Sequence, residues 1–82
     1  MIDVLYFAWL RERIGAPKER IETDAATVAD LVEELKARSE AHALAFSDMA
    51  SVRVAVDQDL TEMTAPLAGA REVAFFPPMT GG

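Results

Sequence analysis

The chain has 82 residues, of which 51% are hydrophobic and 27% charged, and its net charge is −6 at pH 7. This length and composition favour a single folded domain with a modest core and exclude a disordered chain. A phosphate backbone would repel the acidic excess, so we expect no nucleic acid as a partner and favour a protein with a basic face.

The chain contains no cysteine, which excludes disulfides, thiolate metal sites and thiol catalysis by its own residues. No run of apolar residues is long enough for a membrane-spanning helix, so no membrane contact is expected. The first residues, MIDVLYFAWLRERIG, lack the basic leader of a signal peptide. We therefore expect a cytoplasmic protein.

The first predicted element is a strand over residues 2–8, IDVLYFA. Alternation divides it into an inward set, Ile2, Val4 and Tyr6, and an outward set, Asp3, Leu5 and Phe7. The outward face is more apolar than solvent requires. Residues 9–18 are expected to form a helical turn that Gly15 ends, and residues 19–23 a short edge strand that pairs antiparallel with the first.

A helix is predicted from Thr27 to Ser39. Its apolar residues recur at the spacing of one helix face: Val28, Leu31, Val32 and Leu35. Thr27 is the expected N-cap, with Asp30 three residues further on. Glu34 and Arg38 are spaced to form an ion pair on the exposed face. Such a helix covers a sheet with one face.

The second half of the chain is predicted to contain two further strands. Residues 41–51 form either a short helical piece or irregular cover, and VRVAVD then alternates as a strand. Residues 57–71 read as turns. The last strand, EVAFF, directs Phe75 inward and Phe76 outward, and Pro77 ends its pairing because proline lacks an N–H group.

This order of elements predicts an α+β domain over residues 1–76, with a mixed β-sheet covered on one face by a helix. The first and last strands are expected to lie side by side in the middle of the sheet. Residues 77–82 form a flexible C-terminal tail. The two prolines keep its base extended, and its six residues reach roughly 20 Å.

The sequence offers no catalytic apparatus of its own. DQDLTE, residues 57–62, begins like a calcium loop, but Glu62 stands where the loop requires glycine. His42 is the single histidine, so a histidine-rich metal site is excluded. The remaining candidate is the terminal carboxyl of Gly82. A carboxylate is a poor electrophile at neutral pH, so a partner enzyme must activate it, for example with ATP.

Five motifs then occur in order and at fitting intervals: VLYFA, RERIG, VAVDQDL, PLAGAREVAFFPP and the terminal TGG. Through them the whole chain resembles the small subunits of molybdopterin synthase, which are sulfur carriers with the β-grasp, ubiquitin-like fold. The resemblance implies that Gly82 is the catalytic residue. An adenylating enzyme would activate it with ATP, and a sulfurtransferase route would convert it to a thiocarboxylate.

The resemblance also implies a complex in which this chain binds no cofactor or metal. The large synthase subunit would accept the tail in a heterotetramer, and the sulfur would pass to cyclic pyranopterin monophosphate to build the dithiolene of molybdopterin. The family's partner-facing apolar residues correspond to Phe7, Leu60 and Phe76. The tail residues that would enter the partner are Pro77, Pro78, Met79, Thr80 and Gly81.

Three alternatives remain open at this point. The thiamine-pathway sulfur carrier shares the expected fold and terminus. A ubiquitin-like protein modifier would join Gly82 to a lysine through an isopeptide bond. A plain interaction domain would carry an inert tail. The roles of Trp9, Arg11 and Met49 are not decided by the sequence.

Overall fold

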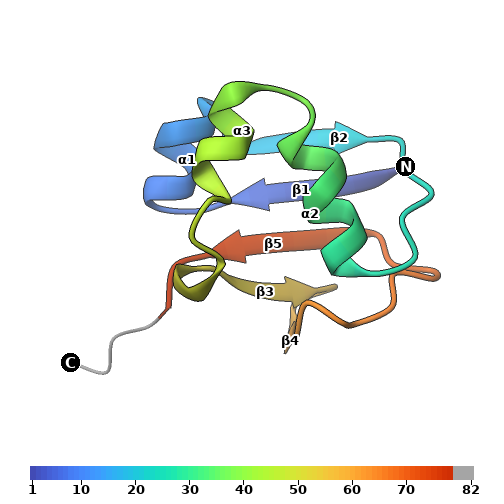
Figure 1. Ribbon diagram of the computed structural model, residues 1–82. Coiled ribbons are helices and arrows are strands. Elements are labelled where there is room, and N and C mark those ends of the chain that lie inside the picture. Colours follow the sequence, from blue (N-terminus) through green and yellow to red (C-terminus); the bar gives the residue numbers. More distant parts are fainter. Residues whose placement is uncertain (79–82) are drawn as a thin grey trace.

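The computed structural model describes residues 1–78, in which five strands form one mixed sheet in the order β2-β1-β5-β3-β4 (Figure 1). The strands are β1 (Ile2–Tyr6), β2 (Lys18–Ile21), β3 (Arg53–Val56), β4 (Asp59–Thr61) and β5 (Glu72–Phe76). β1 and β5 are parallel neighbours, whereas the other pairs are antiparallel. The prediction that the first and last strands adjoin is confirmed.

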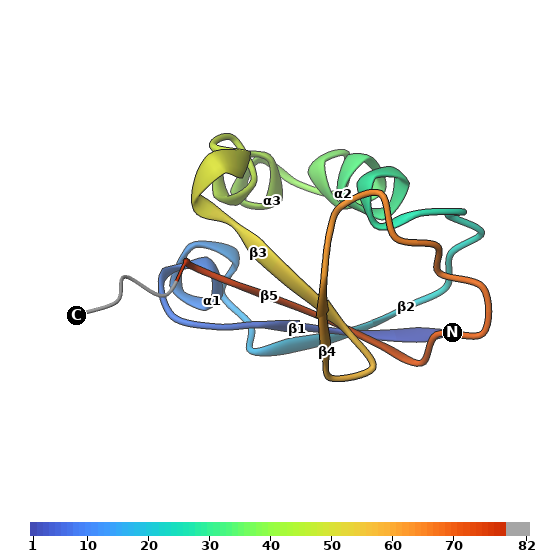
Figure 2. The ribbon, with the colours of Figure 1, turned by 90° about the horizontal axis from the view of Figure 1, so that it is seen from below.

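The helices are α1 (Trp9–Ile14), α2 (Val28–Lys36) and α3 (Glu40–Ala45), followed by the short 3-10 helix η1 (Met49–Ser51). Figure 2 shows α2 and α3 side by side on one face of the sheet, while the opposite face carries no helix. The predicted α+β, β-grasp architecture is thus confirmed, and the ambiguous segment 41–51 is largely helical. No helix in the described part of the chain is long and apolar enough to cross a bilayer.

The core lies between the sheet and α2. Tyr6 of β1 and Phe75 of β5 point inward and are almost fully buried, as alternation predicts. They belong to one core cluster with the apolar face of α2, whose buried residues are those predicted: Val28, Leu31, Val32 and Leu35. Each such side chain contributes about 2 kcal/mol of burial free energy, so this layer holds the sheet and helices in place.

The structure corrects the predicted end of the long helix. Thr27 is the N-cap, and its Oγ1 accepts from the backbone N–H of Asp30 at 3.2 Å. The helix ends at Lys36, however, and not at Ser39. Ser39 instead caps α3, because its hydroxyl oxygen accepts from the backbone N–H of His42 at 3.1 Å.

The predicted Glu34–Arg38 ion pair is wrong for the same reason. Since α2 stops before Arg38, the two residues no longer occupy one helix face. Glu34 accepts a hydrogen bond from Thr23 at 2.8 Å, and Arg38 Nη2 lies 3.6 Å from Oε2 of Glu19.

The sequence analysis missed β4. Residues 57–71 read as turns, yet Asp59–Thr61 pair antiparallel with β3. The turn between β3 and β4 has left-handed backbone at Asp57, with φ 49°, and at Gln58, with φ 72°. Such a hairpin turn is usually marked by glycine or asparagine, and this one contains neither.

Candidate functional site

The helix-free face of the sheet is built from the outward residues of neighbouring strands. One row across this face is fixed by strand register, in which Leu5 pairs with Ala74, Ala74 with Ala55, and Ala55 with Leu60. Two large side chains therefore flank two alanines. Because alanine projects little, the middle of the sheet lies lower than its margins. This face combines an apolar surface with a depression.

A hollow of about 510 Å³ lies over β5 on this face. Its lining is mostly apolar and consists of Phe7, Gln58, Glu72, Ala74, Phe76, Pro77 and Pro78. The hollow extends from the beginning of β5 to the base of the tail. We take it as the candidate site because it adjoins the residues that lead to the predicted reactive terminus.

The predicted partner-facing residues are brought together in part. Phe7, with 45% of its surface exposed, lines the hollow with Phe76, Pro77 and Pro78. Leu60 is 73% exposed on the same face but lies on the edge strand β4, outside the hollow. Met79, Thr80, Gly81 and Gly82 lie outside the described residues, so their predicted roles and the boundary after residue 76 stay predictions.

Three lining residues were not singled out from the sequence: Gln58, Glu72 and Ala74. Strand alternation puts Glu72 and Ala74 on the same outward face as Phe76, but neither side chain has the bulk of a predicted contact residue. Strand alternation could not identify Gln58, which lies in a turn. It reaches the hollow only because the β3–β4 turn folds back beside β5.

The aromatic side chains at the tail end are held by backbone pairing. The N–H of Phe7 donates to the carbonyl of Phe75 at 3.1 Å, which continues the β1–β5 pairing past the end of β1. Leu10 N–H donates to Phe7 O at 3.2 Å as α1 begins. This backbone pairing holds Phe7 beside Phe76.

A buried aromatic cluster supports this end of the sheet from behind. The rings of Phe46 and Phe75 pack edge to face with centroids 5.0 Å apart, and the Tyr6 ring stacks on Phe75 at 6.4 Å. Phe75 and Phe76 are consecutive and point to opposite faces. The cluster therefore anchors the segment that presents Phe76 and the two prolines.

His42 belongs to a hydrogen-bonded network behind the cluster and is 7% exposed. Its Nε2 lies 2.6 Å from Oε1 of Glu19, which also accepts from the Tyr6 hydroxyl at 2.8 Å. Burial raises the pKa of Tyr6, as does the neighbouring Glu19 carboxylate. The single histidine of the sequence thus has a structural place in the core.

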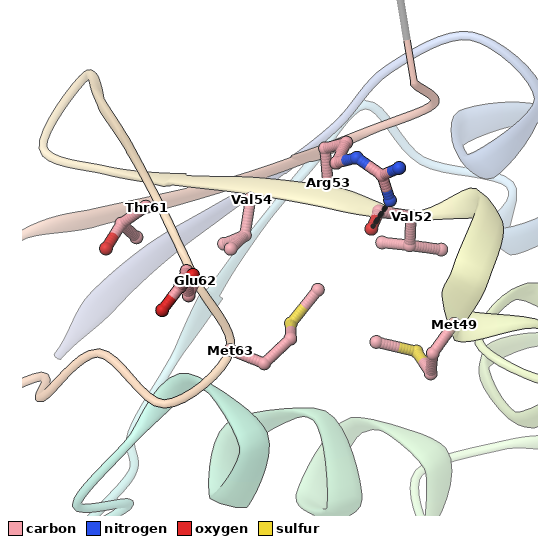
Figure 3. Close-up of a pocket in the computed structure, with 7 residues that line it drawn as sticks. All are labelled: Met49, Val52, Arg53, Val54, Thr61, Glu62 and Met63. Carbon is pink, nitrogen blue, oxygen red and sulfur yellow. Dashed lines mark hydrogen bonds between the residues drawn. The ribbon is translucent and has the colours of Figure 1, made fainter.

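A second hollow, of about 240 Å³, lies between η1, β3 and the end of β4. Figure 3 shows Met49 and Met63 extending toward one another across it. Arg53 turns its guanidinium back to the carbonyls of Ala50 and Val52. Methionine side chains adapt to irregular gaps. The two methionines that line this hollow therefore fill space at the edge of the core. Met49, undecided from the sequence, packs against that core.

The described residues contain no group of three or more histidine, cysteine, aspartate or glutamate side chains placed to hold a metal ion. Within residues 1–78, the candidate site is therefore described by its shape and its mostly apolar lining.

Comparison with known proteins identifies the relatives of this fold and surface. The sequence profile of the ThiS family matches residues 4–82. The chain belongs to the ThiS family. The molybdopterin synthase sulfur carrier subunit of Escherichia coli (strain K12) is 43% identical over 82 residues, which is 100% of both chains. The subunit of that name from Haemophilus influenzae is 38% identical over the same lengths.

A solved structure also resembles the chain in three dimensions. The crystal structure of SAMP1 from Haloferax volcanii has a TM-score of 0.74 and 26% identity, covering 99% of this chain and 98% of that one. This likeness confirms the ubiquitin-like β-grasp fold. The full-length identity to sulfur carrier subunits places the chain among them within the ThiS family.

Proposed function

We propose that this chain is the sulfur carrier of a molybdopterin synthase and that its working group is the terminal carboxyl of Gly82. The observation that carries the proposal is the 43% identity over all 82 residues to a sulfur carrier subunit. A chain without cysteine cannot hold sulfur on a side chain. The resemblance to the sulfur carrier subunits implies that the terminal carboxyl is the group that carries it.

The proposed chemistry has two activation steps. A partner adenylating enzyme joins the Gly82 carboxylate to the AMP part of ATP and releases pyrophosphate. A reduced sulfur donor then displaces AMP and leaves a thiocarboxylate. The α-carboxyl is ionised at neutral pH and unreactive toward nucleophiles, which is why the adenylate is required. An ATP-consuming activation favours the cytoplasm as the place of reaction.

The second half of the cycle takes place in the large synthase subunit. The thiocarboxylate sulfur attacks a side-chain carbon of cyclic pyranopterin monophosphate, where a carbon–oxygen bond breaks and the oxygen leaves as the carbon–sulfur bond forms, and hydrolysis of the resulting thioester returns the Gly82 carboxylate. Transfer of two sulfurs by successive carriers completes the dithiolene of molybdopterin. We propose a heterotetramer, with one carrier at each end of a large-subunit dimer.

The β-grasp domain acts in this scheme as the docking element. Phe7, Phe76 and Leu60 are exposed or half-buried on one face, and the hollow ends at Pro77 and Pro78. Glycine lacks a side chain, so a narrow channel in a partner can close around Gly81 and Gly82. Binding through the domain face positions the terminus for both reactions.

The test is an intact-mass measurement on the chain purified from cells that make molybdenum cofactor. Replacement of one oxygen by sulfur is expected, and the sulfurated chain should convert cyclic pyranopterin monophosphate to molybdopterin with the large subunit. An adduct to a lysine would instead support a protein modifier. An unmodified mass in cells that contain the activating enzyme would contradict the proposal.

A further inference from the structure

Three outward carboxylates lie next to one another at the beginning of β5. Asp3 of β1 stands beside Glu72 in the parallel pair, and Asp57 lies on the other side of Glu72, with its backbone N–H donating to the Glu72 carbonyl at 2.9 Å. Like charges on neighbouring strands destabilise a sheet. Each of these carboxylates therefore needs a compensating partner.

Two of the three carboxylates are compensated within the chain. Asp3 lies 3.8 Å from Lys18 Nζ and 3.5 Å from Arg20 Nε. Asp57 Oδ1 accepts hydrogen bonds from the backbone N–H groups of Arg71 and Glu72 at 2.9 and 3.0 Å. The charge of Asp3 is thus offset by two cations, although its Oδ1 accepts no hydrogen bond within the described residues, and the charge of Asp57 is offset by amide dipoles.

Glu72 differs from both neighbours. Within the described residues 1–78, no ion pair and no side-chain hydrogen bond engages its carboxylate, although the residue is half-buried. It also lines the hollow, and it is the only charged residue among the described residues that do so. An uncompensated charge at a repulsive position is the kind of local conflict that proteins retain where a site has a function.

We propose that Glu72 is a docking residue whose carboxylate pairs with a lysine or arginine of the synthase large subunit, while apolar side chains next to that cation fill the hollow. The inference rests on the proposed function, from which it takes the partner. Glu72 and Phe76 are four residues apart on one strand, so the cation and the apolar contact are about 13 Å apart.

The charge distribution favours this occupant over a second copy of the chain. No lysine or arginine lines the hollow. Lys18 and Arg20 are already paired with Asp3, and Arg53 donates to backbone carbonyls. These three cations are therefore engaged, and the net charge of −6 makes two copies of the chain repel each other, so a partner with a basic face is favoured to supply the missing charge.

The test compares Glu72→Gln and Glu72→Lys in titrations of the full chain with the large subunit. We expect the dissociation constant to rise about tenfold for Glu72→Gln and about a hundredfold for Glu72→Lys. Added salt should weaken wild-type binding more steeply than that of Glu72→Gln. The matched control is Glu33→Lys on α2, a side chain that is 74% exposed on the opposite side of the sheet, and its binding should stay near wild type.

The melting temperature is a second measurement that separates the two roles. If Glu72 only stabilised the fold, its replacement would lower the melting temperature. Removing the repulsion should leave the melting temperature of Glu72→Gln unchanged or raise it, even as binding weakens. Wild-type affinity and salt dependence in Glu72→Gln would overturn the inference, as would a self-associated chain that this substitution dissociates. The proposed function would survive either result if the wild-type thiocarboxylate still delivers sulfur, so the two failures are distinguishable.

Discussion

The Nε2 atom of His42 lies 2.6 Å from Oε1 of Glu19, which joins α3 to the edge strand β2. The other ring nitrogen of His42, Nδ1, lies 2.7 Å from Oγ of Ser39, the residue that caps α3. Both polar atoms of a buried ring are thus satisfied, as burial requires. The network fixes α3 over the aromatic cluster behind the tail.

The first prediction concerns acid. Burial alone would raise the pKa of Glu19, but hydrogen bonds from His42 and Tyr6 and the charges of His42 and Arg38 hold it below its usual 4.5. A carboxyl whose pKa is lower in the folded than in the unfolded chain adds stability above the unfolded value. That contribution is lost as the pH falls below about 4.5.

Urea unfolding between pH 7 and pH 3 measures this effect. The free energy of unfolding should fall less steeply below pH 4.5 in Glu19→Gln than in the wild type. Glu40→Gln, at an exposed position on α3, serves as the control and should keep the wild-type slope. Parallel curves for the wild type and Glu19→Gln would contradict the assigned role.

The second prediction separates the hydroxyl of Tyr6 from its ring. Tyr6→Phe keeps the ring stacked on Phe75 but removes the hydrogen bond to Glu19. A hydrogen bond to a charged group contributes about 1.5 to 3 kcal/mol, and Glu19 keeps its other partners. We therefore expect a loss near the lower value in chemical denaturation. A loss below about 0.5 kcal/mol would mean that the bond adds little.

Phe75 and Phe76 form a matched pair for the third prediction, because they are consecutive and point to opposite faces. Phe76→Asp should change the free energy of unfolding by less than about 1 kcal/mol, since the residue is half-buried on the outer face. Its dissociation constant for the large subunit should rise about a hundredfold or more. Phe75→Ala should instead cost about 3 to 5 kcal/mol of stability.

Calorimetric titration and thermal melting of both variants provide the comparison, with Phe75→Leu as a milder core substitution in case Phe75→Ala does not fold. A Phe76→Asp variant that melts early yet binds normally when folded would assign the residue to the core. It would then have no part in docking.

The fourth prediction concerns the terminus. Deletion of Gly82, or addition of a residue after it, should leave the melting temperature unchanged, because the core is formed by residues 2–75. Thiocarboxylate formation and sulfur transfer should both be lost. The control is Thr64→Ala, a substitution at an exposed position 18 residues before Gly82 in the sequence, and this variant should keep full activity. Retained transfer after the deletion would contradict the role proposed for Gly82.

Much of the fold could be predicted because strand alternation depends on local sequence. The inward and outward residues of β1 and β5 follow directly from their order, and the face that carries Phe7 and Phe76 follows from them. The His42–Glu19 contact could not be predicted, because it joins residues 23 positions apart through the packing of α3 on β2. The end of α2 was missed since Ser39 suits a cap as well as a helix end.

Only those parts of the candidate site that depend on the alternation of a single strand could be predicted from the sequence. Phe7 and Phe76 were found from parity and resemblance, but the hollow between them needs the floor provided by Ala74 and the turn that carries Gln58. Glu72 carries no signal in the sequence, where it is one of fourteen acidic residues. Glu72 differs from the other acidic residues because the carboxylates beside it have compensating contacts and its own has none within the described residues. Those contacts exist only in the assembled sheet.

The last prediction tests the strained turn that places Gln58 at the hollow. Gln58 has φ 72°, a left-handed conformation that costs a side-chain-bearing residue about 1 kcal/mol, whereas glycine adopts it freely. Gln58→Gly should therefore raise the free energy of unfolding by about 0.5 to 1 kcal/mol. Asp57→Gly relieves a similar strain at φ 49° but removes the acceptor of two backbone N–H groups. It should be less stable than the wild type, and urea denaturation of both variants at neutral pH measures the contrast. A destabilised Gln58→Gly would show that its side chain contributes more to the fold than its backbone costs.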